Sequence, residues 1–174
     1  IRPGGATMAV TLNAGFRMPS WFDLRTLAIG GPEDVEGIKA ATKNAHELIR
    51  GEIASGIASN RIMIGGFSQG GALALYAALT FPEPLAGIMA LSCWLPLYDT
   101  FPAAKLCPDT VSLLQCHGDC DPVVPYKFGA MSSGVLKNML KTSQFKSYRG
   151  MSHSSSDEEL ADMKKFVEEH VPRQ

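Results

Sequence analysis

The chain has 174 residues, of which 45% are hydrophobic and 19% are charged. This length and composition are those of a globular protein with room for a substantial core. The formal net charge of −1, without a basic run, gives no reason to expect nucleic acid or an anionic membrane as the main partner. The longest apolar stretch, 85–97, is interrupted by Ser92 and Pro96 and is too short to cross a bilayer.

The cysteines are few for a chain of this size: Cys93, Cys107, Cys116 and Cys120. We expect free thiols in a reducing compartment, and therefore a cytoplasmic protein. Cys116 and Cys120 enclose His117, a pattern that can suggest a metal, but no second ligand pair of matching spacing exists. We therefore expect no metal site.

Strand-like and helix-like segments alternate along the chain. In order, the pattern predicts a strand at 7–13, a long apolar connection at 14–31, a helix at 32–55, a buried strand from 61, a helix at 69–80, a buried strand at 85–92, a strand at 110–116, a helix at 126–141, a short strand at 144–149 and a last helix that ends near 172. Such alternation indicates a three-layer α/β domain spanning 1–174 with a mainly parallel sheet.

Three details of these helices are open to test. The helix at 32–55 is expected to turn one apolar face to the core, formed by Val35, Ile38, Ala41, Ala45, Leu48 and Ile49. The helix at 126–141 is expected to bring Phe128, Met131, Val135, Leu136 and Met139 near the core. A capping box at 155–158 is expected to start the last helix.

The segment 61–76 carries the most informative motif. It begins as a short β-branched, apolar run, turns through Gly66-Phe67-Ser68-Gln69-Gly70 and continues in Ala and Leu, which favour helix. Gly-x-Ser-x-Gly between a strand and a helix is typical of a nucleophile elbow, in which Ser68 is raised above the sheet and the Gln69 N–H faces a developing oxyanion. The alternative is a glycine-rich connection with a buried serine.

Partners for Ser68 follow later strands. Ser68, then Asp119 or Asp121, then His153 stand in the chain order of a serine hydrolase triad. A neutral hydroxyl is a poor nucleophile, and histidine can act as its base because its ordinary pKa lies near neutrality. Since ligands bind at the carboxyl ends of strands in open α/β sheets, we expect these side chains to meet there.

Two choices within this set remain open in the sequence. Asp121 is favoured as the acid because Pro122 forces an extended or turn conformation on it. Asp119, which follows Gly118, suits bracing the turn through backbone N–H groups. His117 lies on the loop of the acid, so it suits packing that loop better than serving Ser68.

The sequence at this point resembles the acyl-protein thioesterase and lysophospholipase group of small serine hydrolases. The stretches that match are Met18-Pro19-Ser20-Trp21-Phe22-Asp23, 61–75, 85–97 (with Ala-Leu-Ser-Cys-Trp-Leu-Pro-Leu), 114–122 (with Gln-Cys-His-Gly-Asp-Cys-Asp-Pro) and 150–155. The resemblance implies an α/β-hydrolase fold, a Ser68/Asp121/His153 triad and an oxyanion donor at Gln69 N–H. It also implies hydrolysis of long-chain acyl thioesters on protein cysteines and of lysophospholipid esters, without a cofactor.

The resemblance does not extend to the N-terminal residues of the chain. Members of this group have earlier strands and a His-Gly-rich loop that supplies a second oxyanion N–H, and nothing in 1–13 resembles that loop. We therefore expect an N-terminally truncated form of the fold. Loss of one oxyanion donor costs about 100- to 1000-fold in rate. The missing loop motivates one alternative, a catalytically impaired form that binds lipid or protein. Another alternative keeps the chemistry but changes the substrate, and is a carboxylesterase for small soluble esters.

An acyl chain needs an apolar groove beside Ser68. The candidates are Leu24, Leu27, Trp94 and Val123, which flank loops expected to meet at the sheet edge. Expected substrates are S-acylated proteins and lysophospholipids, and the same apolar loops suit transient membrane contact.

Overall fold

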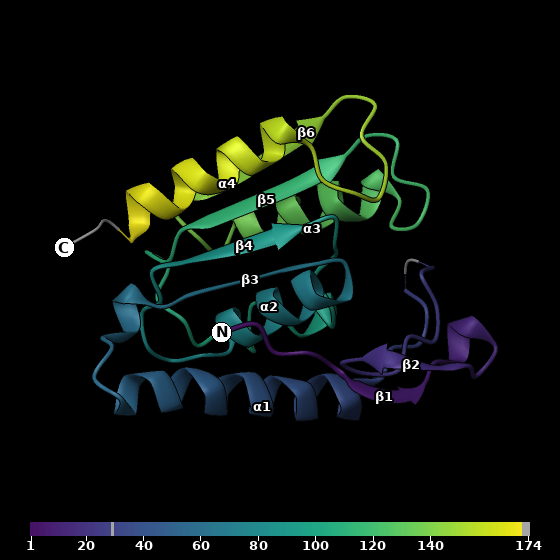
Figure 1. Ribbon diagram of the computed structural model, residues 1–174, viewed down its shortest axis with the longest axis horizontal. Coiled ribbons are helices and arrows are strands. Elements are labelled where there is room, and N and C mark those ends of the chain that lie inside the picture. Colours follow the sequence, from purple (N-terminus) through teal and green to yellow (C-terminus); the bar gives the residue numbers. More distant parts are fainter. Residues whose placement is uncertain (29, 172–174) are drawn as a thin grey trace.

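The computed structural model describes residues 1–28 and 30–171, and its centre is a parallel sheet (Figure 1). The strands of this sheet are β3 (Met63–Phe67), β4 (Gly87–Leu91), β5 (Leu113–Gly118) and β6 (Ser143–Tyr148). They are hydrogen-bonded in the order β3-β4-β5-β6, and every neighbouring pair is parallel. The predicted parallel sheet is confirmed, and all of its carboxyl ends leave at one edge.

Helices cover both faces of this sheet. Helix α4 (Asp157–His170) lies on one face, while α2 (Gln69–Leu79) and α3 (Tyr126–Lys137) lie on the other (Figure 1). Side chains of β5 alternate accordingly, because Leu114 packs in the cluster that contains Phe166 of α4, and Leu113 packs in the cluster that contains Leu136 of α3. The three layers expected from the sequence are therefore present.

Helix α1 (Val35–Ala54) packs against α2 and begins three residues later than predicted. Asp34 is its N-cap, and the side chain of Asp34 accepts a hydrogen bond from Gly37 N. Of the predicted apolar face, Ile38, Ala41 and Ile49 are buried. The prediction was wrong for two end positions of that face, since Val35 and Leu48 are exposed. Both positions lie at the edges of the stripe that Ile38, Ala41 and Ile49 form, where side chains are open to solvent.

The segment before α1 forms a separate antiparallel pair. Strand β1 (Ala6–Ala9) pairs with β2 (Arg17–Ser20), and a 3-10 turn at Thr11–Asn13 lies between them. The predicted strand at 7–13 is therefore too long, and the predicted connection at 14–31 contains a strand. The sequence did not predict β2 because it contains Pro19, and proline within a run of residues argues against a strand except at a sheet edge. This pair does not hydrogen-bond to the central sheet.

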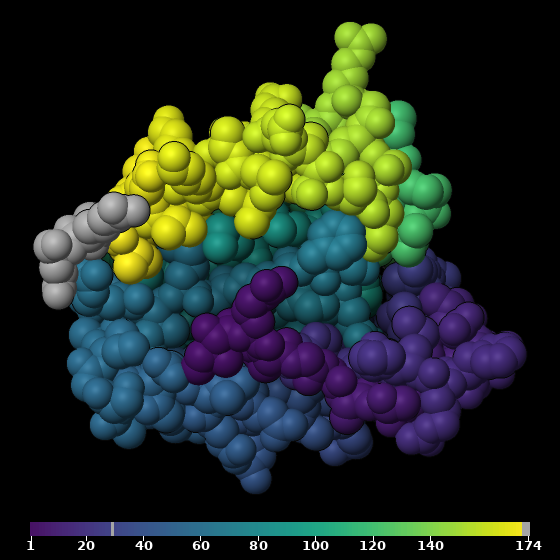
Figure 2. Space-filling view, viewed as in Figure 1, coloured from purple at the N-terminus to yellow at the C-terminus, as the bar shows by residue number. Residues whose placement is uncertain are grey.

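Strand β3 was predicted to be buried, and that prediction was wrong. Phe67 is 40% exposed, and Gly65 is exposed as well. Within the described residues β3 is one of the two edge strands of the sheet, and β6 is the other. In Figure 2 blue and teal atoms are at the surface between the yellow α4 and the purple N-terminal segment. By contrast β4, which has neighbours on both sides, is buried along nearly its whole length as expected.

The remaining elements follow the predicted order with shifted ends. Helix α3 ends at Lys137, and within it Leu136 is buried while Met131 is exposed, contrary to prediction. Short 3-10 turns also occur at Ser59–Arg61 and Tyr98–Thr100. Among the helices of the described residues, none combines the length and the apolar character needed to cross a membrane.

The start of α4 contains a buried acid. The predicted capping box at 155–158 is not formed: the N-cap is Ser156, whose side chain accepts from Glu159 N, and the Glu159 carboxyl group does not bond back to it. The Glu159 side chain is buried, and neither of its carboxyl oxygens has a hydrogen-bond partner among the residues that the structure describes. Burial raises the pKa of Glu159 to about 7, since the charged form loses its hydration. When it is ionised, Glu159 also acts on the Cys116 thiol and adds to the rise of that thiol's pKa.

This acid makes stability depend on pH. The folded protein holds a proton on Glu159 between the unfolded pKa of 4.5 and about 7, so stability decreases as pH rises through this interval. From about pH 5 to pH 8 we expect the free energy of unfolding to fall by up to about 3 kcal/mol through this group. Glu159→Gln removes this decrease, which urea unfolding at both pH values measures.

Glu158 provides the matched control, because it lies in the same helical turn and is exposed. Glu158→Gln should keep the pH dependence of the wild type. Parallel stability profiles for the wild type and Glu159→Gln would contradict the assignment of this pH dependence to Glu159.

Candidate active site

The turn from β3 to α2 has the geometry of a nucleophile elbow. Ser68 has φ 54° and ψ −123°, a conformation that L residues rarely adopt and that costs about 1–3 kcal/mol. A Cβ on Gly66 would lie 2.3 Å from the carbonyl carbon of Gly70, so only glycine permits this close approach. The Ser68 N–H donates to Leu91 O at 2.8 Å, which ties the strained residue to β4. Ser68 thus stands at the N-terminus of α2, where Gln69 N–H is unpaired by the helix.

The acid of the site is held by its own loop. Asp121 is buried, and its Oδ1 accepts from Val123 N and Val124 N, both at 2.9 Å. Its other oxygen, Oδ2, lies 2.7 Å from His153 Nδ1. This contact fixes the proton of the imidazole on Nδ1 and leaves Nε2 as the basic nitrogen.

His153 lies next to the elbow. It belongs to the loop between β6 and α4, and its ring packs on the ring of Phe67 with centroids 4.5 Å apart. Phe67 directly precedes Ser68 in the chain. The structure therefore brings Asp121 and His153 into contact beside the elbow. However, no hydrogen bond joins Ser68 Oγ to His153 in the part of the chain that the structure describes. In active sites without a substrate such bonds are often long, and they shorten when the substrate binds.

His117, the second histidine near the acid, is a packing residue. It is fully buried, and its Nε2 donates to Val124 O at 2.8 Å while lying 3.6 Å from Asp121 Oδ2. Its Nδ1 faces α3, where a Cβ on Gly129 would approach within 2.4 Å. Burial lowers the pKa of His117, so the neutral form is favoured. His117 thus joins the acid loop to β5 and is not directed at Ser68.

Asp119 binds a backbone N–H group, as the sequence suggested, but this group belongs to the neighbouring loop and not to its own turn. Its Oδ1 accepts from Gly150 N at 2.6 Å. This bond joins the loop of Asp121 to the loop of His153. Asp119 therefore acts on the backbone, while Asp121 contacts the imidazole.

A cavity of about 300 Å³ opens between residues of 26–28 and 30–33, the segment after β4 and helix α3. Its lining is mostly apolar and consists of Thr26, Leu27, Ala28, Gly30, Gly31, Glu33, Trp94, Leu95, Tyr98, Asp99, Phe128, Met131, Ser132 and Val135. Of the predicted pocket residues, Leu27 and Trp94 line it, whereas Leu24 and Val123 do not. Sequence reasoning missed Phe128 and Met131 because it assigned them to the core.

Glu33 is a carboxyl group within this lining that the sequence did not single out as a site residue. Its Oε2 accepts from Leu97 N at 2.8 Å. Burial raises the pKa of Glu33, and hydrogen bonds from Leu97 N and the Trp94 side chain partly oppose this rise. Glu33 thereby holds the cavity wall that carries Trp94. In the part of the chain that the structure describes, no cluster of three or more His, Cys, Asp or Glu side chains could hold a metal.

Comparison with known proteins gives consistent matches over nearly the whole chain. The sequence profile of a family described as Phospholipase/Carboxylesterase matches residues 1–171. The chain is 41% identical to acyl-protein thioesterase 1 of Gibberella zeae, over 99% of this chain and 77% of the relative. It is 40% identical to acyl-protein thioesterase 1 of Mycosarcoma maydis, over 100% of this chain and 78% of the relative.

Solved structures agree with this similarity. Arabidopsis thaliana SOBER1 superimposes with a TM-score of 0.91 at 32% identity, covering 98% of this chain and 83% of that chain. Acyl-protein thioesterase 2 of Zea mays superimposes with a TM-score of 0.82 at 30% identity, covering 97% of this chain and 80% of that chain.

Proposed function

The chain belongs to the phospholipase/carboxylesterase family of α/β-hydrolases, and we propose that it removes long-chain acyl groups from S-acylated protein cysteines. The observation that carries this proposal is the 2.7 Å contact of Asp121 with His153, beside a strained elbow that presents Ser68. The family resemblance inferred from the sequence motifs is confirmed by the matches to acyl-protein thioesterases. The chain is a serine hydrolase acting on thioester or ester bonds.

The proposed reaction uses each group in one role. Ser68 Oγ attacks the thioester carbonyl carbon while His153 Nε2 takes its proton, and Asp121 stabilises the imidazolium that forms. The negative charge on the carbonyl oxygen is met by Gln69 N–H at the positive end of α2. The carbon–sulfur bond then breaks, and the leaving thiolate receives the proton from His153. Water, activated by the same histidine, releases the fatty acid from Ser68.

The cavity supports a long-chain substrate, because part of its wall follows β4, and the carboxyl end of β4 lies beside that of β3, which leads to Ser68. Its walls include Leu27, Trp94 and Phe128, and burying each methylene of an acyl chain contributes about 0.8 kcal/mol. Lysophospholipid esters present the same acyl carbonyl and tail, so they are proposed as a second substrate class. Small soluble esters would gain nothing from this cavity.

Hydrolysis of a palmitoylated peptide tests the proposal. Ser68→Ala should abolish turnover, and Asp121→Asn should lower kcat by about 10⁴-fold because the imidazole loses its fixed tautomer. Asp119→Asn is the matched control, since it removes a carboxylate from the same loop without touching His153. The decrease in kcat in this control should be far smaller than in Asp121→Asn. Rates for Ser68→Ala equal to the wild type would reject the function. Preference for acetyl over palmitoyl substrates would favour a carboxylesterase for small esters.

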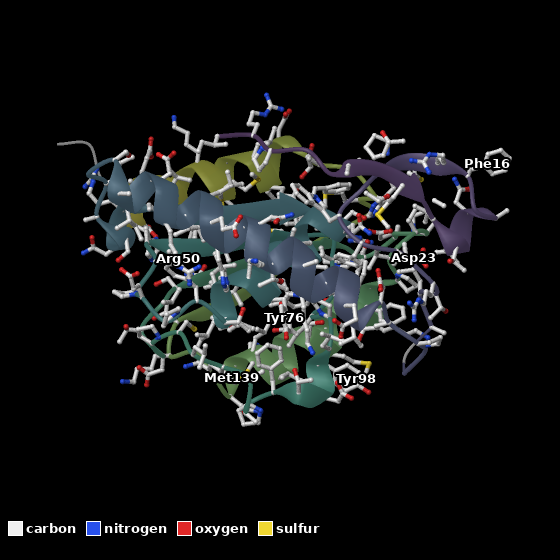
Figure 3. The ribbon with its side chains drawn as sticks, turned by 90° about the horizontal axis from the view of Figure 1, so that it is seen from below. Phe16, Asp23, Arg50, Tyr76, Tyr98 and Met139 are labelled. Atoms are coloured by element: carbon white, nitrogen blue, oxygen red, sulfur yellow. The ribbon has the colours of Figure 1, made fainter. Side chains whose placement is uncertain are left out.

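We infer that transient membrane contact occurs through the tip of the β1–β2 hairpin. Leu12, Phe16 and Met18 are exposed there, and Phe16 is 70% exposed. Figure 3 places Phe16 at the far end of the molecule. By comparison Leu24 and Leu27, which the sequence suggested for membrane contact, are half-buried.

The buried thiols of Cys93, Cys107 and Cys116 are free, which supports a cytoplasmic location.

Flotation with phosphatidylcholine vesicles measures this contact. Phe16→Ser together with Leu12→Ser should reduce vesicle binding about tenfold or more, because two apolar side chains no longer enter the interface. Leu106, which is 61% exposed outside the hairpin, supplies the control Leu106→Ser. Vesicle binding that is unchanged in the hairpin variant would contradict the inference.

A further inference from the structure

The side chain of Gln69 links two segments that are far apart in the sequence. Its Oε1 accepts from Trp21 N at 3.0 Å, and its Nε2 donates to Phe22 O at 2.8 Å. A primary amide is suited to this pair of bonds because it offers an acceptor and a donor side by side. A carboxylate of the same shape could accept from Trp21 N but would face Phe22 O with a second oxygen.

The segment held in this way leads directly into the cavity wall. Phe22 is buried against α1 and α2, and the chain beyond it supplies Thr26, Leu27 and Ala28 to the lining. The β1–β2 pair that precedes Trp21 has no hydrogen bonds to the central sheet, so side-chain contacts must fix its position relative to the elbow. Asp34 holds the next residue, because its Oδ2 accepts from Asp23 N at 2.8 Å.

The Trp21 side chain also meets the elbow. A Cβ on Gly70 would lie 3.6 Å from Trp21 Nε1, so the indole is in contact distance of the first turn of α2. Gln69 thus has two roles. Its backbone N–H faces the oxyanion, and its side chain sets the position of the cavity wall at 26–28. A long acyl chain must hold its carbonyl at Ser68 and its tail in the cavity at the same time, whereas an acetyl group occupies only the position at Ser68.

We propose that the Gln69 side chain is a positioning residue for acyl-chain length, holding the wall segment at 21–28 in register with Ser68. This proposal rests on the proposed function, because it assigns the cavity to the acyl chain. Loss of the two hydrogen bonds displaces the wall segment and slows the hydrolysis of long-chain substrates. The backbone N–H of residue 69 remains in every substitution. The specificity of the site therefore depends on a contact outside the cavity itself.

The test compares dodecanoyl and acetyl 4-nitrophenyl esters in Gln69→Met, which keeps the length of the side chain, and Gln69→Glu. In both variants the ratio of kcat/KM for dodecanoyl over acetyl should fall about tenfold, with most of the change in the KM for dodecanoyl. Thr80→Val is the control, since the Thr80 hydroxyl bonds Tyr76 O at the other end of α2. It should leave the ratio unchanged. An equal loss for both esters in the Gln69 variants would overturn the proposal.

Two readouts do not require turnover. Amide hydrogen exchange at Trp21 should accelerate in Gln69→Met, because its acceptor is gone, but not in Thr80→Val. Calorimetric affinity for a non-hydrolysable dodecyl ketone should weaken about tenfold in Gln69→Met. Unchanged exchange or unchanged affinity would overturn the proposal. A wild type that binds the ketone in this Gln69-dependent way but hydrolyses neither ester would instead reject the hydrolase function alone.

Discussion

The parallel arrangement of β3 to β6 is the constraint on which the candidate site depends. Because these strands run in one direction, the segments that follow β3, β5 and β6 all leave at the same edge of the sheet. Ser68, Asp121 and His153 come from those segments. Although Asp121 and His153 are 32 positions apart and Ser68 lies still further from His153, the three residues reach one region through short connections.

Backbone hydrogen bonds then set the geometry within this region. Asp121 is oriented by two N–H groups of its own loop, and His117 ties the same loop to β5. Asp119 joins that loop to the one that carries His153. The acid and the histidine are consequently held before any substrate arrives, which is the preorganisation that electrostatic catalysis requires.

The sequence predicted most of this from local signals. The elbow glycines, the chain order of the polar residues and the apolar runs of β4 and β5 led to the fold and to the contact between Asp121 and His153. It did not predict β2 or the exposure of β3, because both depend on which strand lies alongside. Nor did it identify the cavity role of Phe128 or the contact of the Gln69 amide with Trp21, since no local pattern records a partner 48 residues away.

The central claim is that Ser68 is an activated nucleophile served by His153. Treatment of the folded protein with a fluorophosphonate, followed by peptide mapping, measures this directly. The account predicts a single adduct on Ser68 that forms rapidly in the wild type and at least about 100-fold more slowly in His153→Ala. Absence of labelling in the folded wild type, or equal labelling in both proteins, would contradict it.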